Sequence, residues 1–381
     1  MTRLFRKIPI AEPDLSGNEE KYIIECIKGG WISSKGKFVD QFEKNFASYI
    51  GVKHAIAVSS GTAALHLALA ALDIKPSDEI IMPTFTMIAC ANAAKYLGAK
   101  PVLVDSEVST WNIDPNKIEE KITSKTKAIM VVHIYGHPAD MDSIMKIAKK
   151  YGLYVIEDAA EAHGAEYKGK KVGSIGDIGC FSFYANKIIT TGEGGAVVTN
   201  DDEIAEKVRK LRDQAYNANL RKWLIHDDIG YNYRLTNLQA AIGLAQLERI
   251  EEFINRHREN AYYYNSLLKN IRGIILPPEM PWAKNVYWMY TILINEEILG
   301  ITRDDLMRKL ETYGIDARST FLPIHLQTPY KNIYTNEKYP IAELLGRRGI
   351  NLPSGNSTTK EIIEYVVSAI KETISGCSLH G

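Results

Sequence analysis

Cysteine is scarce in this 381-residue sequence, and its positions argue against a disulfide framework. The four cysteines, Cys26, Cys90, Cys180 and Cys377, are far apart and lack the short spacing of a zinc site. Scattered cysteines of this kind are typical of a reducing compartment. The sequence also lacks an apolar run long enough to span a membrane, and its first twenty residues lack the apolar core of a secretory signal. We expect a soluble cytoplasmic protein without a metal site.

An excess of one charge is absent as well. Lys+Arg and Asp+Glu both number 46, so the formal net charge is zero, and no basic run resembles a nucleic-acid-binding arm. We therefore expect neither a nucleic-acid nor a membrane partner. The hydrophobic content of 45% suffices for a large core, and the length exceeds that of one average domain. We expect a larger domain over residues 1–250 and a smaller one over residues 251–381.

Short apolar runs alternate with amphipathic segments through the first half of the sequence. The runs lie at residues 55–58, 79–82, 101–105, 128–132, 153–158, 178–183 and 195–199, and the predicted helices at 61–72, 89–94, 143–151 and 201–214. Because the runs are continuously apolar, they favour strands that are covered on both faces. The alternation predicts an α/β fold around a mostly parallel sheet, whose ligands bind at the carboxyl ends of the strands.

The second half of the sequence changes character and predicts a small α+β unit. Thr236 is a candidate N-cap for one long helix that runs toward Leu268. After the pair of prolines at 277–278 we expect a strand over residues 287–294, a helix over 302–313 and a final helix over 360–374.

Lys187 is the most informative single residue. It lies in the apolar and hydroxyl-rich stretch FSFYANKIITTGEGG, with no charged neighbour before Glu193. Burial would lower the pKa of its amine, which would make it a nucleophile of the kind that forms a Schiff base. On this stretch alone, a lysine that extends to solvent is an equal alternative.

Two further groups follow predicted strands. Asp158 ends one strand, where a carboxylate could pair with a pyridinium nitrogen, although capping or bracing a loop is an equally common role. The turn SSGTAA over residues 59–64 opens a helix and could bind one phosphate through its N–H groups and a hydroxyl. It matches neither the dinucleotide nor the P-loop pattern. Together with Lys187, these groups describe a site for pyridoxal phosphate.

The sequence resembles the fold-type I pyridoxal phosphate enzymes, and among them the DegT-type sugar-nucleotide aminotransferases. The matching stretches are SSGTAALHLAL, PTFTMIACANA, VHIYGHPADM, VIEDAAEAHGA, GDIGCFSFYANKIITTGEGGAVVTND and IGYNYRLTNLQAAIGLAQLE, which span most of the chain. Within the family, GGWISSKGKFV and RRGINLPS are most similar to the GDP-perosamine synthases. The resemblance implies a large, mostly parallel α/β domain and a smaller C-terminal α+β domain.

The resemblance also implies roles for residues that match its motifs. Lys187 would form the Schiff base with the cofactor, and Asp158 would pair with the pyridine nitrogen. The phosphate would be bound by Ser60, Gly61, Thr62 and Ser182. Asn232 would reach the phosphate of the cofactor in a neighbouring subunit. This role implies a homodimer or a dimer of dimers with shared active sites.

Some positions depart from the family pattern or are less certain. Met87 stands where many relatives place an aromatic residue on the cofactor ring, and Phe85 is the alternative. Glu161 stands where relatives often carry Gln or His near the 3′-oxygen of the ring, and it could instead contact the sugar. His163 is expected to be structural. The candidate substrate contacts are Trp31, Ser33, Glu161 and His325, although Trp31 could only pack and His325 could only brace a turn.

The implied reaction moves an amino group from glutamate to C4 of an NDP-4-keto-6-deoxy sugar. With GDP-4-keto-6-deoxy-D-mannose the product would be GDP-perosamine, a precursor of the O-antigen of lipopolysaccharide. The alternatives are a UDP- or dTDP-keto sugar as substrate, or a regulatory relative without catalysis. Sugar 3-dehydratases of the same fold replace the lysine with histidine, so Lys187 argues against that activity.

Overall fold

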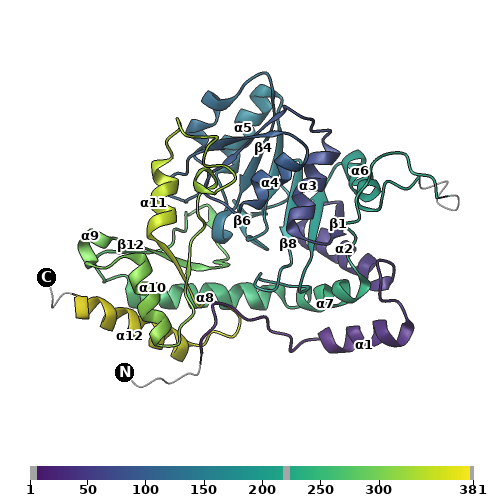
Figure 1. Ribbon diagram of the computed structural model, residues 1–381. Coiled ribbons are helices and arrows are strands. Elements are labelled where there is room, and N and C mark those ends of the chain that lie inside the picture. The colour runs from purple at the N-terminus through teal and green to yellow at the C-terminus, as the bar shows by residue number, and fades with distance from the viewer. Residues whose placement is uncertain (1–6, 218–223, 378–381) are drawn as a thin grey trace.

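The computed structural model of the protein describes residues 7–217 and 224–377, and its centre is a seven-stranded sheet in the order β1-β9-β8-β5-β4-β2-β3 (Figure 1). All strands except β9 run in one direction, because β9 pairs antiparallel with both of its neighbours. The strands are β1 (His54–Val58), β2 (Glu79–Pro83), β3 (Lys100–Val104), β4 (Thr126–Val132), β5 (Tyr154–Asp158), β8 (Ile178–Ser182) and β9 (Gly195–Thr199).

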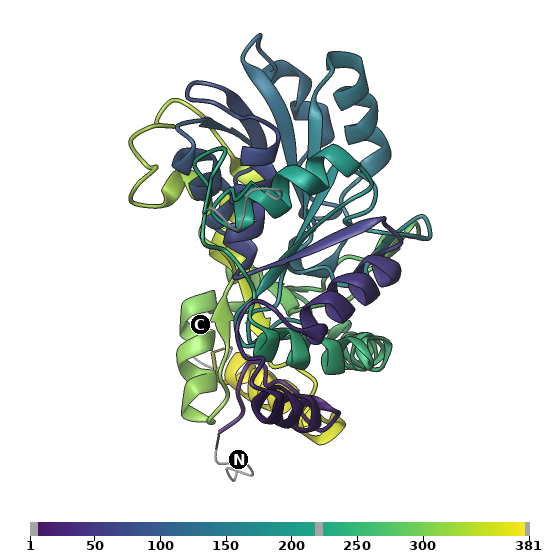
Figure 2. The same ribbon diagram turned by 90° about the vertical axis from the view of Figure 1, so that its right-hand side faces the viewer.

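Each strand predicted in the first half of the sequence is present, and the mostly parallel α/β sheet is confirmed. Strands β2, β8 and β9 are buried along their whole length, as expected for a sheet with helices on both faces (Figure 2). The surrounding helices are α1 (Glu19–Gly29), α2 (Lys37–Ile50), α3 (Gly61–Ala71), α4 (Ala89–Tyr96), α5 (Met141–Tyr151) and α6 (Asp202–Arg212).

Helix α3 is apolar nearly all round and lies in the core against β8 and β9. Its first turn therefore has a fixed position beside the carboxyl end of β8.

The long helix predicted from Thr236 to Leu268 is wrong, because two helices occupy this segment. Helix α7 (Asn237–Leu247) begins with the predicted cap, a capping box between Thr236 and Gln239. Helix α8 (Ile250–Leu268) follows after a break at Arg249, whose backbone is not helical. The guanidinium of Arg249 donates to both carboxylate oxygens of Asp14, at 3.0 and 3.2 Å. A contact with the distant N-terminal segment thus coincides with the break.

A second, four-stranded sheet in the order β10-β12-β14-β13 packs with helices α8, α10 and α12 around a separate core. Its elements are β10 (Ile274–Ile275), β12 (Tyr290–Ile294), β13 (Arg318–Ser319), β14 (Gly349–Leu352), α9 (Glu296–Leu299), α10 (Arg303–Thr312) and α12 (Lys360–Cys377). The strand expected from residue 287 begins at Tyr290, because Tyr287 has a φ of 48° that a strand cannot contain. A small third sheet consists of β6 (Glu166–Tyr167), β7 (Lys170–Lys171) and β11 (Ala283–Lys284).

The chain crosses between the two cores more than once. The first turns of α8 pack in the larger core and its last turns in the smaller one. Helix α11 (Pro340–Arg348) returns to the larger core, where Asp105 accepts hydrogen bonds from the amides of Ile341 and Ala342 at its start. The division of the chain at residue 250 stays a prediction. No helix in the described part of the chain is both long and apolar enough to cross a membrane.

Candidate active site

A cavity of about 450 Å³ opens at the carboxyl ends of the central strands, where the sequence predicted the site. Most of its lining residues follow strands of the central sheet, and the others lie in or next to β12 and β13 of the second sheet. The predicted residues that it brings together are Ser60, Gly61, Thr62, Met87, Asp158, Glu161, Ser182 and Lys187.

One end of the cavity is the first turn of α3. The Ser60 hydroxyl caps this helix by accepting the N–H of Ala63 at 3.1 Å. Among the described residues, the amides of Gly61 and Thr62 donate to no protein acceptor. Free N–H groups and the positive end of the helix dipole make a binding site for an anion. The turn also packs closely on the end of β8, since a Cβ on Gly61 would lie 2.8 Å from the Cβ of Ser182. This end can therefore hold one phosphate.

Asp158 is the last residue of β5 and is held in a fixed orientation. Its Oδ1 accepts the amide of Ala160 at 3.1 Å, and its Oδ2 accepts the thiol of Cys90 at 3.0 Å. The side chain is almost fully buried but still lines the cavity. A buried carboxylate with an oxygen facing a cavity favours a cationic partner, such as a protonated ring nitrogen.

The neighbouring carboxylate, Glu157, points away from the cavity into a cluster of donors. It accepts the amides of Gly173, Ile175 and Gly176, each at 2.7 Å, and lies 2.9 Å from Nε2 of His133. Burial acts to raise the pKa of Glu157, but the His133 contact and the backbone donors outweigh it and keep that pKa below its usual value. Glu157 therefore anchors the turn before β8 and fixes β5 behind Asp158.

Lys187 lies in the turn after β8, where its amide donates to the carbonyl of Tyr184 at 2.9 Å. Its side chain is partly buried and its amine reaches into the cavity. Burial lowers the pKa of Lys187, although the nearby charges of Glu161 and Asp158 oppose this effect. The pKa of this amine is therefore shifted in the direction that the sequence suggested, toward a stronger nucleophile at a given pH.

Glu161 faces the same amine from the loop after β5. Its Oε2 accepts the amide of Tyr135 at 2.8 Å. Burial raises the pKa of Glu161, and the charge on Lys187 opposes the shift. The backbone of Tyr135 has a φ of 51°, which is rare for a large residue and aims this amide at the carboxylate.

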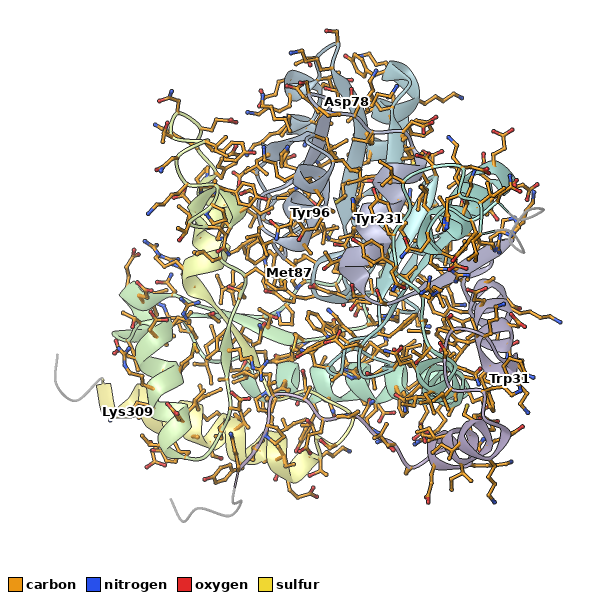
Figure 3. All side chains as sticks on the ribbon, turned by 45° about the vertical axis from the view of Figure 1, so that its right-hand side comes forward. Trp31, Asp78, Met87, Tyr96, Tyr231 and Lys309 are labelled. Atoms are coloured by element: carbon orange, nitrogen blue, oxygen red, sulfur yellow. The ribbon has the colours of Figure 1, made fainter. Side chains whose placement is uncertain are left out.

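Asn232, Trp31 and Ser33 are three predicted contact residues that lie outside the cavity of this chain. Asn232 is exposed and pairs with Asp213 beside the end of α6. Trp31 is 61% exposed, and its carbonyl and that of Ser33 accept from Asn237. Figure 3 shows Trp31 at the edge of the molecule and Met87, which is 49% exposed, near its middle. The cavity lining thus does not include Trp31 or Ser33, and their role in substrate binding stays a prediction.

His325 and two other predicted residues have structural surroundings. His325 is buried, with its Nδ1 2.8 Å from the hydroxyl of Thr84 and its Nε2 3.3 Å from Glu343. Phe85 is buried outside the cavity lining and packs edge-on against Tyr135. His163 lies between two phenylalanine rings, and burial lowers its pKa to about 3.

The cavity also contains residues that the sequence did not single out. Tyr184, Asn186 and Glu193 belong to the Lys187 stretch, whose apolar and Gly-rich pattern was the available signal. Trp288, Arg318 and Phe321 come from the second half of the chain. No local pattern distinguishes them, because Trp288 and Phe321 reach the cavity only where the later part of the chain returns to the larger core.

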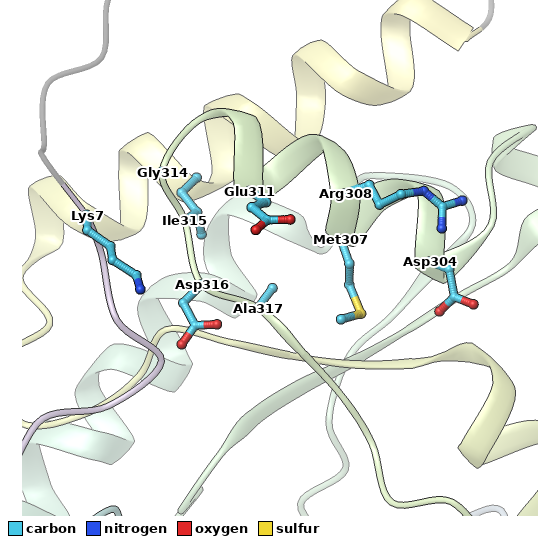
Figure 4. Close-up of a pocket in the computed structure, with 9 residues that line it drawn as sticks. All are labelled: Lys7, Asp304, Met307, Arg308, Glu311, Gly314, Ile315, Asp316 and Ala317. Carbon is cyan, nitrogen blue, oxygen red and sulfur yellow. The ribbon is translucent and has the colours of Figure 1, made fainter.

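A second cavity, of about 580 Å³, lies between α10 and the segment around Lys7 (Figure 4). Its walls carry both acids and bases, including Asp304, Arg308, Glu311 and Asp316. The one lysine in its described lining, Lys7, is exposed, so this cavity lacks a buried amine like that of Lys187.

Comparisons with known proteins agree with this geometry. The model of the DegT/DnrJ/EryC1/StrS aminotransferase family matches residues 13–371. The GDP-perosamine synthase of Caulobacter vibrioides is 48% identical and covers 97% of this chain and 98% of its own length. The GDP-perosamine synthase of Escherichia coli O157:H7 is also 48% identical and covers 97% of this chain and 99% of its own length. The solved structure of DesI in the presence of its TDP-sugar product has a TM-score of 0.92 at 29% identity, over 100% of this chain and 96% of its own.

The cavity and the comparisons point to one conclusion. A phosphate-sized anion site, an oriented carboxylate and an amine of lowered pKa suit pyridoxal phosphate, and the family match covers nearly the whole chain. The chain therefore belongs to the DegT/DnrJ/EryC1/StrS aminotransferase family and is a pyridoxal-phosphate-dependent sugar-nucleotide aminotransferase.

Proposed function

We propose that the chain transfers an amino group from glutamate to C4 of GDP-4-keto-6-deoxy-D-mannose and so forms GDP-perosamine. The observation that carries this proposal is the 48% identity to two GDP-perosamine synthases over nearly the full length of each. The lysine in the cavity supports transamination, because its amine can both hold a carbonyl group and move protons. The product would serve O-antigen or related glycan synthesis, and we propose that the enzyme acts in the cytoplasm.

The residues of the cavity take the following parts in this proposal. Pyridoxal phosphate, when bound, supplies an electron sink for the carbon next to the transferred nitrogen. The first turn of α3 and Ser182 hold its phosphate, and Asp158 keeps a proton on its ring nitrogen. Lys187 would hold the cofactor through its amine, and the same amine would take a proton from Cα of the amino donor. In the second half-reaction Lys187 delivers a proton to C4 of the sugar.

Glu161 and Met87 complete the ring site in this proposal. In this proposal the Glu161 carboxyl hydrogen-bonds to the 3′-oxygen of the ring or to a sugar hydroxyl, and its raised pKa supports a protonated, donating form. The Met87 thioether lines the cavity and can pack on the ring face.

We further propose that the active unit is a homodimer, alone or within a dimer of dimers. Asn232 would bind the phosphate of the neighbouring subunit's cofactor. Its exposure supports this, as does the rigid backbone around it, since the amides of Tyr231 and Tyr233 donate to the end of α6 at 2.7 and 3.1 Å. The carbonyl of Tyr233 also accepts from the amide of Ser59, the first residue of the turn over residues 59–64.

A different nucleotide is the second candidate, supported by the TDP-sugar product of the structural neighbour. The test is a parallel assay with glutamate and the GDP-, UDP- and dTDP-linked 4-keto-6-deoxy sugars, in which product mass is measured. We expect the GDP sugar to gain the amino group fastest. A clear preference for a UDP or dTDP sugar would overturn the perosamine assignment and leave the aminotransferase intact. A protein that aminates none of them would favour the regulatory alternative.

A further inference from the structure

Trp288 makes two contacts with the Lys187 segment. The centroid of its ring lies 3.6 Å from Nζ of Lys187, so the amine rests on the face of the indole. Its Nε1–H donates to the backbone carbonyl of Asn186 at 2.6 Å. One rigid side chain thus contacts both the peptide that carries Lys187 and the amine at its tip.

No polar contact competes with this arrangement in residues 7–217 and 224–377. There, the Lys187 amine makes no hydrogen bond or ion pair, and the charged or titratable groups around it act from a distance. These groups are Asp158, Glu161, His163, Glu193 and Arg318. A lysine has four rotatable bonds in its side chain, so an amine without a polar partner needs a packing surface to stay in one place.

The indole itself is fixed by its neighbours. It is only 5% exposed and stacks on the ring of Tyr135, which in turn stacks on Phe321 with 5.4 Å between centroids. The amide of Trp288 also donates to the carbonyl of Tyr135 at 3.1 Å. Because the amide of Tyr135 binds Glu161, the same stack sets the position of the acid that faces the amine.

We propose that Trp288 is a positioning residue that holds the amine of Lys187 where it attacks the cofactor aldehyde, an inference that rests on the role proposed for Lys187. In that step Nζ forms a bond to the aldehyde carbon, and the aldehyde oxygen leaves as water with both amine protons. The indole speeds the step by restricting the amine to the cavity, since correct orientation accelerates a bond-forming reaction. The contacts that fix the first turn of α3 and the carboxylate of Asp158 do not include Trp288.

The test uses cofactor-free protein with Trp288→Leu and Trp288→Phe. The control is Trp282→Phe, because Trp282 packs on Tyr167 and His137 and does not line the cavity. Two quantities are measured in each variant. The first is the affinity for pyridoxine 5′-phosphate, which has the phosphate and ring of the cofactor but no aldehyde. The second is the rate at which saturating pyridoxal phosphate attaches to Lys187, trapped with borohydride and located by peptide mass.

We expect Trp288→Leu to slow attachment by about tenfold or more while the affinity for pyridoxine 5′-phosphate changes by less than about twofold. Trp288→Phe keeps a ring but loses the Nε1–H hydrogen bond, so its attachment rate should lie between those of Trp288→Leu and the wild type. Trp282→Phe should attach the cofactor at the wild-type rate. Attachment at the wild-type rate in Trp288→Leu would overturn the proposal. So would a parallel loss of both quantities in the two Trp288 variants, because that result indicates a merely structural role. If wild-type protein attaches the cofactor at another lysine, the role of Lys187 itself is wrong.

Discussion

Replacement of Gly61 by alanine perturbs the phosphate end of the cavity through one added carbon. Gly61 does not have a positive φ, so alanine fits the backbone, and the whole effect comes from the added Cβ. That atom would lie 2.8 Å from the Cβ of Ser182 and 3.3 Å from its Cα. To reach the 3.4 Å of an ordinary contact, the first turn of α3 or the end of β8 must move.

The size of the effect follows from this overlap. Neither partner can rotate away, because Ser182 is buried at the end of a central strand and α3 is fixed in the core. Overpacking of this kind costs about 1–3 kcal/mol. If this free energy is added to the cofactor-bound state, cofactor affinity drops by about fivefold to a hundredfold, since about 1.4 kcal/mol corresponds to a factor of ten.

The assay is an absorbance titration of cofactor-free protein with pyridoxal phosphate, together with a thermal melt. Gly376→Ala is the matched control, because a Cβ there meets no atom within 4 Å and Gly376 lies at the end of α12. We expect the control to bind as the wild type does. Wild-type affinity in a folded Gly61→Ala variant would refute the assignment of the α3 turn as the phosphate site.

Three other predictions concern the framework of the site. Glu157→Gln places an NH₂ group against backbone donors in a buried cluster. The free energy of unfolding, measured in urea at pH 7, should therefore fall by about 3 kcal/mol. A change near zero would mean that the cluster carries no charge. Burial lowers the pKa of His137 from 6.5 to about 4. The folded protein therefore keeps its full stability with respect to this group above pH 6.5, and that stability is lost as the pH falls toward 4. His137→Asn should therefore reduce the loss of stability between pH 7 and pH 5 by about 2 kcal/mol, and an unchanged loss would contradict the buried neutral state. Asp105→Ala removes the acceptor for two amides at the start of α11 and should lower the melting temperature through a loss of about 1–2 kcal/mol, which a wild-type melt would disprove.

The fold and half of the cavity could be predicted because their signals are local. Continuous apolar runs predicted the central strands, and Ser60 predicted the start of α3. Lys187 and Asp158 stood out because an amine in an apolar stretch and a carboxylate at a strand end are unusual in their immediate surroundings.

The rest could not be predicted because it depends on contacts between distant segments. The break before α8 accompanies a contact of Arg249 with Asp14, more than 200 residues earlier. Trp288 and Phe321 reach the cavity only because the chain crosses between its two cores. The strand predicted from residue 287 starts late because Tyr287 adopts a positive φ that no sequence period reveals.

The most direct test of the proposed chemistry compares Lys187→Ala with wild-type protein in the steady-state formation of 2-oxoglutarate from glutamate and GDP-4-keto-6-deoxy-D-mannose. We expect Lys187→Ala to bind the cofactor phosphate but to lose turnover by at least about a thousandfold, because the amine both holds the aldehyde carbon and moves the proton. Turnover by Lys187→Ala at the wild-type rate would contradict the assignment of Lys187 as the catalytic amine.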